Sequence, residues 1–172
     1  MNWITKFIKP KISSLFKKKT TDTNRALWTT CECKNLIYRE DLQNNLNCCP
    51  KCGSHHKLTC SERFEIFFDD KEFKIIKTPM PKDDPLNFVD NKKYTDRLKA
   101  ARKKTNQDDA VLIATGKLKN IQVTVGAQDF RFIGGSFGAA SGEAFIHGVQ
   151  NAIDNKNPFI FFSCSGGQRM ME

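Results

Sequence analysis

The stretch that decides the fold is ASGEAFIHGVQNAIDNKNPFIFFSC, residues 140–164. Residues 140–154 carry apolar side chains at helical spacing, and Pro158 marks the boundary that follows them. Residues 159–164 are short and largely apolar, which predicts a strand. The stretch therefore predicts a helix that leads directly into a strand.

Residues 110–127, AVLIATGKLKNIQVTVGA, predict two strands before this helix. A tight turn near Lys119-Asn120 is expected to join them. The second strand, 121–127, forms a β-α-β unit with the helix and the strand at 159–164. We expect the two strands of this unit to be parallel, with a right-handed crossover.

Upstream of this unit, two further helices are predicted. Thr59 and Glu62 have the spacing of a capping box, which indicates a helix start, and residues 95–105 predict a charged helix. The predicted fold class is α/β. The chain divides into a basic flexible tail at 1–24, a cysteine-rich unit at 25–58 and an α/β unit at 59–172.

The composition is ordinary for a globular protein, with 39% hydrophobic and 27% charged residues. No apolar run approaches the ~20 residues that a membrane-spanning helix needs. The net charge of +9 is uneven, because the first nineteen residues hold six lysines and no acid. Such a stretch can touch a membrane surface or nucleic acid, but we interpret it as a solvated tail. Lysines interrupt its apolar residues, unlike a secretory signal, and it lacks the arginines of a mitochondrial presequence.

Five of the seven cysteines fall within 22 positions, namely Cys31, Cys33, Cys48, Cys49 and Cys52. An odd, clustered count favours metal ligation in a reducing compartment over disulfides, so we expect a cytoplasmic protein. Cys49-Pro-Lys-Cys52 is a metal-binding knuckle, and a spacer of fifteen residues separates it from the pair Cys31 and Cys33. This spacing predicts a four-cysteine zinc ribbon. Four thiolates leave no open position on the ion, so the zinc would be structural.

The ligand set has an alternative. Cys31 and Cys33 form a C-x-C pair, which is one residue shorter than the usual C-x2-C knuckle. Cys48 can therefore replace one of the four ligands. Buried free cysteines without a metal are the remaining interpretation.

Two glycine-rich turns accompany the predicted strands, Gly134-Gly135 and Ser165-Gly166-Gly167. Either can simply be a turn. However, an SGG after a strand and before a predicted helix places consecutive N–H groups where they stabilise developing negative charge. No G-x-S-x-G, Walker A or H-E-x-x-H motif is present, and His147 is expected on a helix face. The residues thus predict oxyanion stabilisation without an acid–base pair.

Four motifs occur in a characteristic order: L-W-T-x-C, LIYREDLQNNLNCCPKCGSHH, GGSFG and SGGQRMME. Together they span the chain from Leu27 to Glu172. In this order they resemble the carboxyltransferase β subunits of bacterial-type acetyl-CoA carboxylase.

The resemblance implies a crotonase-like (ClpP/crotonase) spiral of β-β-α units preceded by the zinc ribbon. It implies transfer of a carboxyl group from carboxybiotin to acetyl-CoA, which gives malonyl-CoA for fatty-acid synthesis. The biotin is carried by the separate biotin carboxyl carrier protein and is carboxylated by biotin carboxylase. The β subunit pairs with an α subunit of related fold, in a heterotetramer of two α and two β chains, and the active site lies between them.

The resemblance also assigns site residues. Gly166 and Gly167 would supply the backbone oxyanion hole for the enolate, and Gly134 and Gly135 would line the acyl-CoA cleft. Arg169 would brace the turn rather than contact substrate.

The sequence departs from the family pattern in three respects. The first cysteine pair is short, and Gln168 stands where the family usually has alanine, so it can crowd the thioester. Family members also continue well beyond this motif. We therefore expect an N-terminal part of a β subunit, with an incomplete spiral that is inactive by itself. The alternatives are a degenerate, non-catalytic subunit that only binds partners and a nucleic-acid-binding zinc-ribbon module supported by the basic charge.

Overall fold

A computed structural model describes residues 27–172. The predicted basic tail at 1–24 lies outside the described residues. The chain divides between His56 and Lys57 into two compact units, which are described separately below. Within the described part, no helix is both long and apolar enough to cross a membrane.

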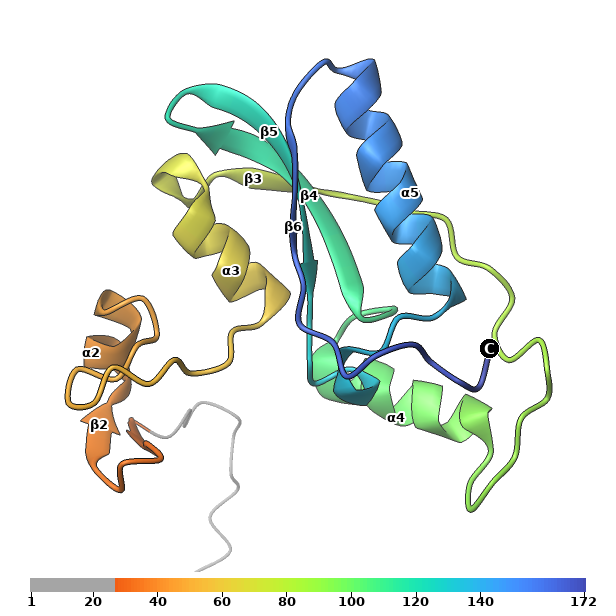
Figure 1. The fold of residues 1–172 in the computed structure, drawn as a ribbon, viewed down its shortest axis with the longest axis horizontal. Helices are drawn as coiled ribbons and strands as arrows, with labels where there is room; N and C mark the ends of the chain where they lie inside the picture. The colour runs from red at the N-terminus through yellow and green to blue at the C-terminus, as the bar shows by residue number, and fades with distance from the viewer. Residues whose placement is uncertain (1–26) are drawn as a thin grey trace, which may run out of the picture. The chain divides into compact units, whose positions relative to one another are not determined.

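The first unit is small and is built around one hairpin (Figure 1). Strand β1 (Trp28–Thr30) pairs antiparallel with β2 (Leu36–Tyr38), and the short helix α2 (Arg39–Asn44) follows at once. The sequence between the cysteine pairs does not form strands throughout. It holds one strand and then a helical turn, which buries Leu42 next to Ile37 in the centre of the unit.

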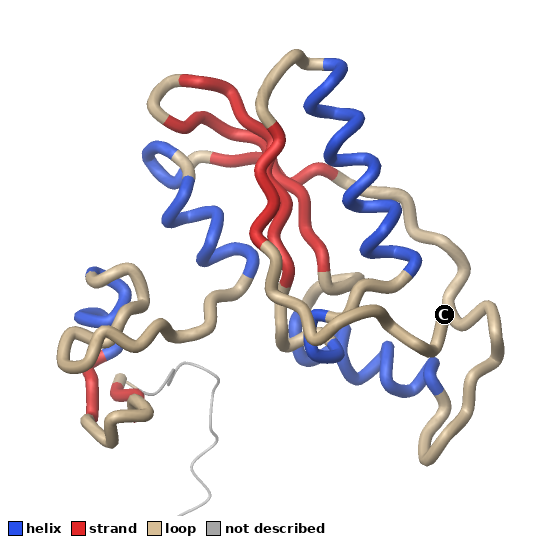
Figure 2. The backbone as a smooth tube through the Cα atoms, in the orientation of Figure 1, coloured by secondary structure: helices blue, strands red, loops and turns tan. Residues whose placement is uncertain are grey.

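The second unit is a four-stranded mixed sheet with helices on both faces (Figures 1 and 2). Its elements, in chain order, are α3 (Cys60–Phe67), η1 (Asp69–Lys71), β3 (Phe73–Ile76), α4 (Tyr94–Thr105), β4 (Val111–Leu118), β5 (Ile121–Gln128), η2 (Ile133–Gly135), α5 (Ala139–Asp154) and β6 (Phe159–Phe162).

The sheet confirms the predicted hairpin and the predicted parallel pair. The strand order is β3-β4-β5-β6, with β3–β4 and β4–β5 antiparallel and β5–β6 parallel. Leu118 pairs with Ile121 across the turn. Lys119 and Asn120 have φ values of 49° and 63°, the left-handed pair that a two-residue hairpin turn needs.

Alternation along the strands divides the core into two layers. Ala114 and Val125 face α3, where they pack with Phe64. Val111 and Ile113 face α5, where they pack with Ala144. Because successive strand residues point to opposite faces, one sheet supports both helices.

Two further features concern helices α3 and α4. Helix α3 begins with the predicted capping box, in which the Thr59 hydroxyl accepts from the Glu62 N–H and the Glu62 carboxylate accepts from the Thr59 N–H. Helix α4 buries Tyr94 and Leu98 against Phe132, the residue just before η2. This contact anchors the start of the first glycine turn against α4.

Candidate zinc site and glycine turns

The four predicted ligands converge in the first unit. The Sγ atoms of Cys31, Cys33, Cys49 and Cys52 all lie within 4.8 Å of one another. Sγ of Cys31 is 3.6 Å from that of Cys52, and Sγ of Cys33 is 3.9 Å from that of Cys49. Thiolates arranged tetrahedrally around zinc at about 2.3 Å lie about 3.8 Å apart. The donor set therefore fits a structural zinc ion.

Local backbone geometry explains how a short first pair still contributes two ligands. Lys34 takes a left-handed conformation with φ of 64°, and its N–H donates to the Cys31 carbonyl at 2.9 Å. The Asn35 amide donates to Sγ of Cys33 at 3.3 Å, an interaction that suits a metal-bound thiolate. The tight turn after Cys33 replaces the longer knuckle.

The second pair forms the expected knuckle. The Lys51 N–H donates to Sγ of Cys49 at 3.4 Å, and Gly53 closes the turn with φ of 74°. Ser54 hydrogen-bonds Sγ of Cys52 through its side chain and its backbone, and these bonds lower the pKa of Cys52 to about 6. A cysteine with such a pKa is largely thiolate at neutral pH, which is the form that binds metal.

Cys48 is not a member of the cluster, so the alternative ligand set is wrong. Its Sγ lies 3.5 Å from Nδ1 of His55. The backbones of Cys48 and His55 also form an isolated antiparallel β-bridge. Neighbouring residues on extended backbone point in opposite directions, so Cys48 faces away from the cluster while Cys49 faces the other three ligands. Cys60 is also excluded, because it lies in the core of the second unit and burial raises its pKa to about 12.

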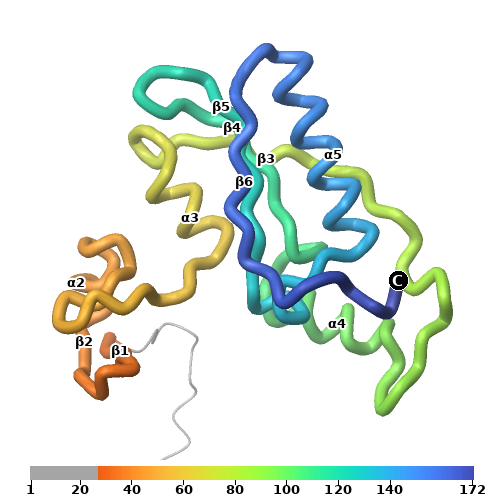
Figure 3. Tube along the Cα trace, in the orientation of Figure 1, coloured from red at the N-terminus to blue at the C-terminus, as the bar shows by residue number. Residues whose placement is uncertain are grey.

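The two glycine turns of the second unit lie side by side, although about thirty positions separate them in the sequence (Figure 3). The Gly166 N–H donates to the Gly134 carbonyl at 2.9 Å. Three residues further along, the Phe137 N–H donates to the Gly167 carbonyl at 2.9 Å, and the Arg169 N–H returns to the Phe137 carbonyl at 3.0 Å. All four glycines that the sequence singled out therefore belong to one place.

The four glycines have different reasons to be glycine. A Cβ at Gly135 would lie 2.1 Å from the Cys164 carbonyl oxygen, so Gly135 is required for packing. Gly134 and Gly167 have φ values of 65° and 122°, and a Cβ on either would meet open space. At Gly166 the nearest atom would be the Gly134 oxygen at 3.4 Å. Three of the four thus leave room for another molecule to approach the backbone.

The helix expected after Gly167 is not formed, and this prediction was wrong. Residues 163–172 have no helical segment. A helix would need its carbonyls to accept from N–H groups four residues later. Here the carbonyl of Gly167 and the N–H of Arg169 are both used by Phe137. The N–H of Gly167 is held by the Ser165 hydroxyl at 3.0 Å.

The Arg169 side chain links the two turns through hydrogen bonds. Its guanidinium is buried and makes a bidentate ion pair with Asp109, with both N–O distances 2.8 Å. It also donates to the Ser136 carbonyl at 2.8 Å and to the Ser136 hydroxyl at 3.1 Å. Burial opposes its charge, but the hydrogen bonds and charge of Asp109 outweigh burial and raise the pKa of Arg169. Ser141 on α5 donates to Asp109 at 2.6 Å and completes the ion pair's surroundings.

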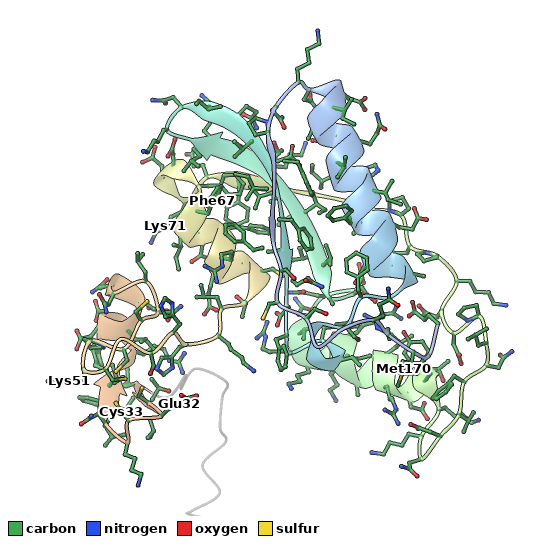
Figure 4. The ribbon with its side chains drawn as sticks, viewed as in Figure 1. Glu32, Cys33, Lys51, Phe67, Lys71 and Met170 are labelled. Atoms are coloured by element: carbon green, nitrogen blue, oxygen red, sulfur yellow. The ribbon has the colours of Figure 1, made fainter. Side chains whose placement is uncertain are left out.

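The same segment reaches the start of α5. The Glu172 carboxylate accepts from the Ala139 N–H at a helix end that has no side-chain cap, and from the Tyr94 hydroxyl. Burial, together with the hydrogen bond to Glu172, raises the pKa of Tyr94, so the phenol stays protonated as a donor. Between Arg169 and Glu172, Met170 points outward and is 87% exposed (Figure 4).

Three residues that hold the turns have no signal in the sequence: Asp109 and Tyr94, which bond Arg169, and Gln128, which bonds the Gly135 carbonyl. Asp109 lies sixty residues from Arg169, and nothing near it in the sequence marks it as a partner. His147 is half-buried on α5, as expected for a residue on a helix face. The residues of the two glycine turns can supply backbone N–H groups as hydrogen-bond donors, and they include no side-chain base.

Comparison with known proteins gives two family matches. Residues 28–52 match the acetyl-CoA carboxylase zinc finger domain, and residues 57–172 match the carboxyl transferase domain. The second match covers most of the chain. This chain belongs to the carboxyl transferase family. The predicted α/β class, preceded by a four-cysteine zinc ribbon, is thereby confirmed.

Individual relatives agree. The chain is 47% identical over its whole length to the acetyl-coenzyme A carboxylase carboxyl transferase subunit beta of Pelagibacter ubique (strain HTCC1062), of which it covers 57%. It is 43% identical over its whole length to the same subunit of Jannaschia sp. (strain CCS1), of which it covers 54%. The chain therefore spans a little over half the length of the curated relatives that it matches.

Solved structures similar to this chain include the transcarboxylase 12S core with hydrolysed methylmalonyl-coenzyme A bound, at 23% identity and a TM-score of 0.49. That match covers 78% of this chain and 22% of the other. The β subunit of P. aeruginosa geranyl-CoA carboxylase is 16% identical with a TM-score of 0.45, covering 77% of this chain and 20% of the other.

Proposed function

We propose that this chain forms part of the β subunit of an acetyl-CoA carboxylase carboxyltransferase. The reaction moves a carboxyl group from carboxybiotin to acetyl-CoA and gives malonyl-CoA for fatty-acid synthesis. One observation carries the proposal: relatives that bear this name are 47% and 43% identical over the whole chain, including both the ribbon and the glycine turns. The chain corresponds to only part of those relatives, so the activity is assigned to the whole assembly.

The proposed chemistry needs a site for negative charge. Loss of a methyl proton turns acetyl-CoA into its enolate, whose oxygen requires hydrogen-bond donors. Carboxybiotin releases CO2, the biotin nitrogen left behind takes the methyl proton, and the enolate carbon attacks CO2. The new carbon–carbon bond gives malonyl-CoA, and biotin is regenerated. Because biotin accepts the proton, the enzyme needs donors but no side-chain base.

Gly166 and Gly167 remain the proposed donors to the enolate oxygen. The geometry adds a requirement, because both N–H groups already have partners in the described structure, the Gly134 carbonyl and the Ser165 hydroxyl. Of these partners, the Ser165 hydroxyl is the easier to displace, since it belongs to an exposed side chain. We therefore expect Gly167 to engage the enolate oxygen first.

The acyl-CoA cleft is proposed to run past Gly134. The space beside Gly134 is open, which supports this role, and Gly135 is proposed to contribute its backbone only, since its Cα faces the Cys164 carbonyl. Gln168 is exposed next to this place, so it is available to touch the thioester rather than to fill the core.

The proposed partners follow from the same assignment. They are an α subunit in a heterotetramer of two α and two β chains, the biotin carboxyl carrier protein that holds the biotin, and biotin carboxylase. The proposed location is the cytoplasm, where fatty-acid synthesis supplies these partners. Activity is proposed to require the α subunit, so that this chain alone would be inactive.

The test is malonyl-CoA formation by the assembled carboxyltransferase with Gly166→Ala in the β subunit. The new Cβ projects into the proposed cleft while the backbone keeps an ordinary φ, so the fold is expected to survive. We expect kcat to fall about 100-fold, because the added methyl group would hold the thioester about 1 Å away from the N–H donors. The control is Gly142→Ala, a helical glycine whose added Cβ would meet only Phe137 at 3.7 Å.

Two outcomes would overturn the proposal. Unchanged kcat with Gly166→Ala would exclude the glycine turn from the site. Normal assembly with the α subunit but no malonyl-CoA from the unaltered complex would instead identify a degenerate subunit that only binds partners.

A further inference from the structure

The end of the β5–β6 ladder is filled by a side chain. The two strands pair in parallel from Thr124↔Phe159 to Ala127↔Phe162, and the pairing then stops. The next residues along, Gln128 and Ser163, would be the following pair. Beyond this point, the chain leads from β5 into the first glycine turn and from β6 into the second (Figure 3).

Gln128 spans the gap with its side-chain amide. Its Nε2 donates to the Gly135 carbonyl at 3.1 Å, and its Oε1 accepts from the Cys164 N–H and from the Ser163 hydroxyl, both at 3.1 Å. The residue is only 5% exposed. A primary amide carries the same donor and acceptor as a peptide group, so it can continue a ladder where backbone no longer reaches.

We propose that Gln128 is a positioning residue that sets the separation of the two glycine turns. Its amide bonds one carbonyl of the first turn and one N–H just before the second, so the two can move neither apart nor past each other without breaking a buried hydrogen bond. The effect on catalysis rests on the proposed function, whereas the effect on the spacing of the turns does not.

Close packing next to the amide makes the spacing matter. The α-carbon of Gly135 lies so near the Cys164 carbonyl that a Cβ there would be 2.1 Å from the oxygen. Two residues beyond Cys164, the Gly166 N–H bonds the Gly134 carbonyl at 2.9 Å. A displacement at Cys164 is therefore passed directly to the N–H groups proposed to hold the enolate. Misplacement of reacting groups by about 1 Å costs on the order of 100-fold in rate.

The variants that test this are Gln128→Met and Gln128→Asn. Methionine has nearly the same length but no hydrogen bonds, and asparagine keeps the amide on a side chain one methylene shorter. The matched control is Gln122→Met on the same strand, because Gln122 is exposed and its amide bonds only Thr115 within its own hairpin.

Two measurements are made on the full β chain in its complex with the α subunit. Hydrogen exchange is expected to speed up about tenfold or more at the Cys164 and Gly166 amides in both variants, with the β4–β5 amides unchanged. Steady-state malonyl-CoA synthesis is expected to show kcat lowered by about tenfold to 100-fold, with KM for acetyl-CoA changed by less than about twofold. Gln122→Met should match the unaltered complex in both.

Three results would overturn the positioning role. They are unchanged exchange at Cys164 and Gly166, loss of protection across the whole sheet, or a fall in kcat that Gln122→Met reproduces. If the unaltered complex makes no malonyl-CoA, the proposed function fails, and the exchange measurement still decides whether Gln128 spaces the turns.

Discussion

In the ribbon, the buried cluster consists of Cys31, Cys49 and two aliphatic side chains, Ile37 and Leu42. In the carboxyl transferase unit, the clusters are built from phenylalanines and aliphatic residues that cover both faces of a sheet. Two of the four buried residues of the ribbon are therefore metal ligands. In the larger unit, the buried cysteine Cys60 is part of the hydrophobic core and is not a ligand. The first unit depends on zinc for its core, and the second depends on burial of apolar surface.

The difference has a practical meaning for mutations. A ribbon with so few buried side chains has little stability left once a ligand is removed. The larger unit distributes its stability over many contacts, so single changes there should be graded by burial and by hydrogen bonding. Four predictions test this difference, and they are ordered from the largest expected effect to the smallest.

Removing one zinc-binding thiolate should affect the two units differently. We expect Cys49→Ser to lose zinc and unfold the ribbon, because metal binding contributes on the order of 10 kcal/mol to such folds. The carboxyl transferase unit should stay folded. Zinc content by elemental analysis and peptide-level hydrogen exchange measure the two effects.

The adjacent substitution Cys48→Ser is the control, since Cys48 contacts His55 instead of the cluster. It should retain one zinc per chain. Loss of zinc with Cys48→Ser, or retention with Cys49→Ser, would contradict the ligand set.

In the larger unit, the most costly polar change should be at the buried ion pair. Asp109→Asn removes the bidentate partner of the buried Arg169 guanidinium and leaves it the single contact with the Glu172 carboxylate, and we expect it to cost about 3 kcal/mol of unfolding free energy. Asp83→Asn breaks a bidentate pair with Arg102 that is exposed, and it should cost less than about 1 kcal/mol. Urea unfolding compares the two, and equal costs would show that burial does not decide the effect.

The capping box of α3 offers a smaller and purely local test. Thr59→Ala removes the acceptor for the Glu62 N–H and should destabilise the unit by about 1 kcal/mol. Thr95→Ala, within the first turn of α4 but outside its cap, is the comparison. The midpoint of thermal unfolding should fall with Thr59→Ala and stay constant with Thr95→Ala.

The smallest effect is a change in pH dependence at the hairpin turn. Asp69 accepts from the N–H groups of Asn120 and Lys119, and these bonds lower its pKa. A carboxylate with a depressed pKa stabilises the folded state above its ordinary pKa, and that contribution is lost as the pH falls through the folded-state pKa. Asp69→Asn should therefore flatten the acid side of the stability curve, measured by unfolding between neutral pH and pH ~3.

Asp70→Asn, which makes the same change of charge at the next residue, is the control for Asp69. A slope that Asp70→Asn changes as much as Asp69→Asn would mean that overall charge, and not the turn, sets the acid side.

The elements that the sequence predicted are those specified by neighbours in the chain. The Thr59 capping box, the Lys119-Asn120 turn and the helix before Pro158 each depend on residues a few positions apart. The cysteine ligands were found because their spacing is itself the pattern. The parallel pairing of β5 with β6 followed from the helix that lies between the two strands in the sequence.

The features that the sequence did not predict depend on distant partners. A helix after Gly167 was expected from local pattern alone, but Phe137, thirty residues earlier, takes the hydrogen bonds it needs. Asp109 and Gln128 are unremarkable in sequence and gain their roles only when the strand ends bring the turns together. The glycines could be named as candidates, but which of them packs and which is open required the positions of Cys164 and its neighbours.

Strand β6 has one more consequence, for handling the protein. It lies at the edge of the sheet, and its four apolar residues, Phe159 to Phe162, are all only half-buried. Among the described residues nothing pairs with its outer side. An edge of this kind is a template for adding strands from other molecules. Residues 27–172 prepared alone at high concentration should therefore associate edge to edge.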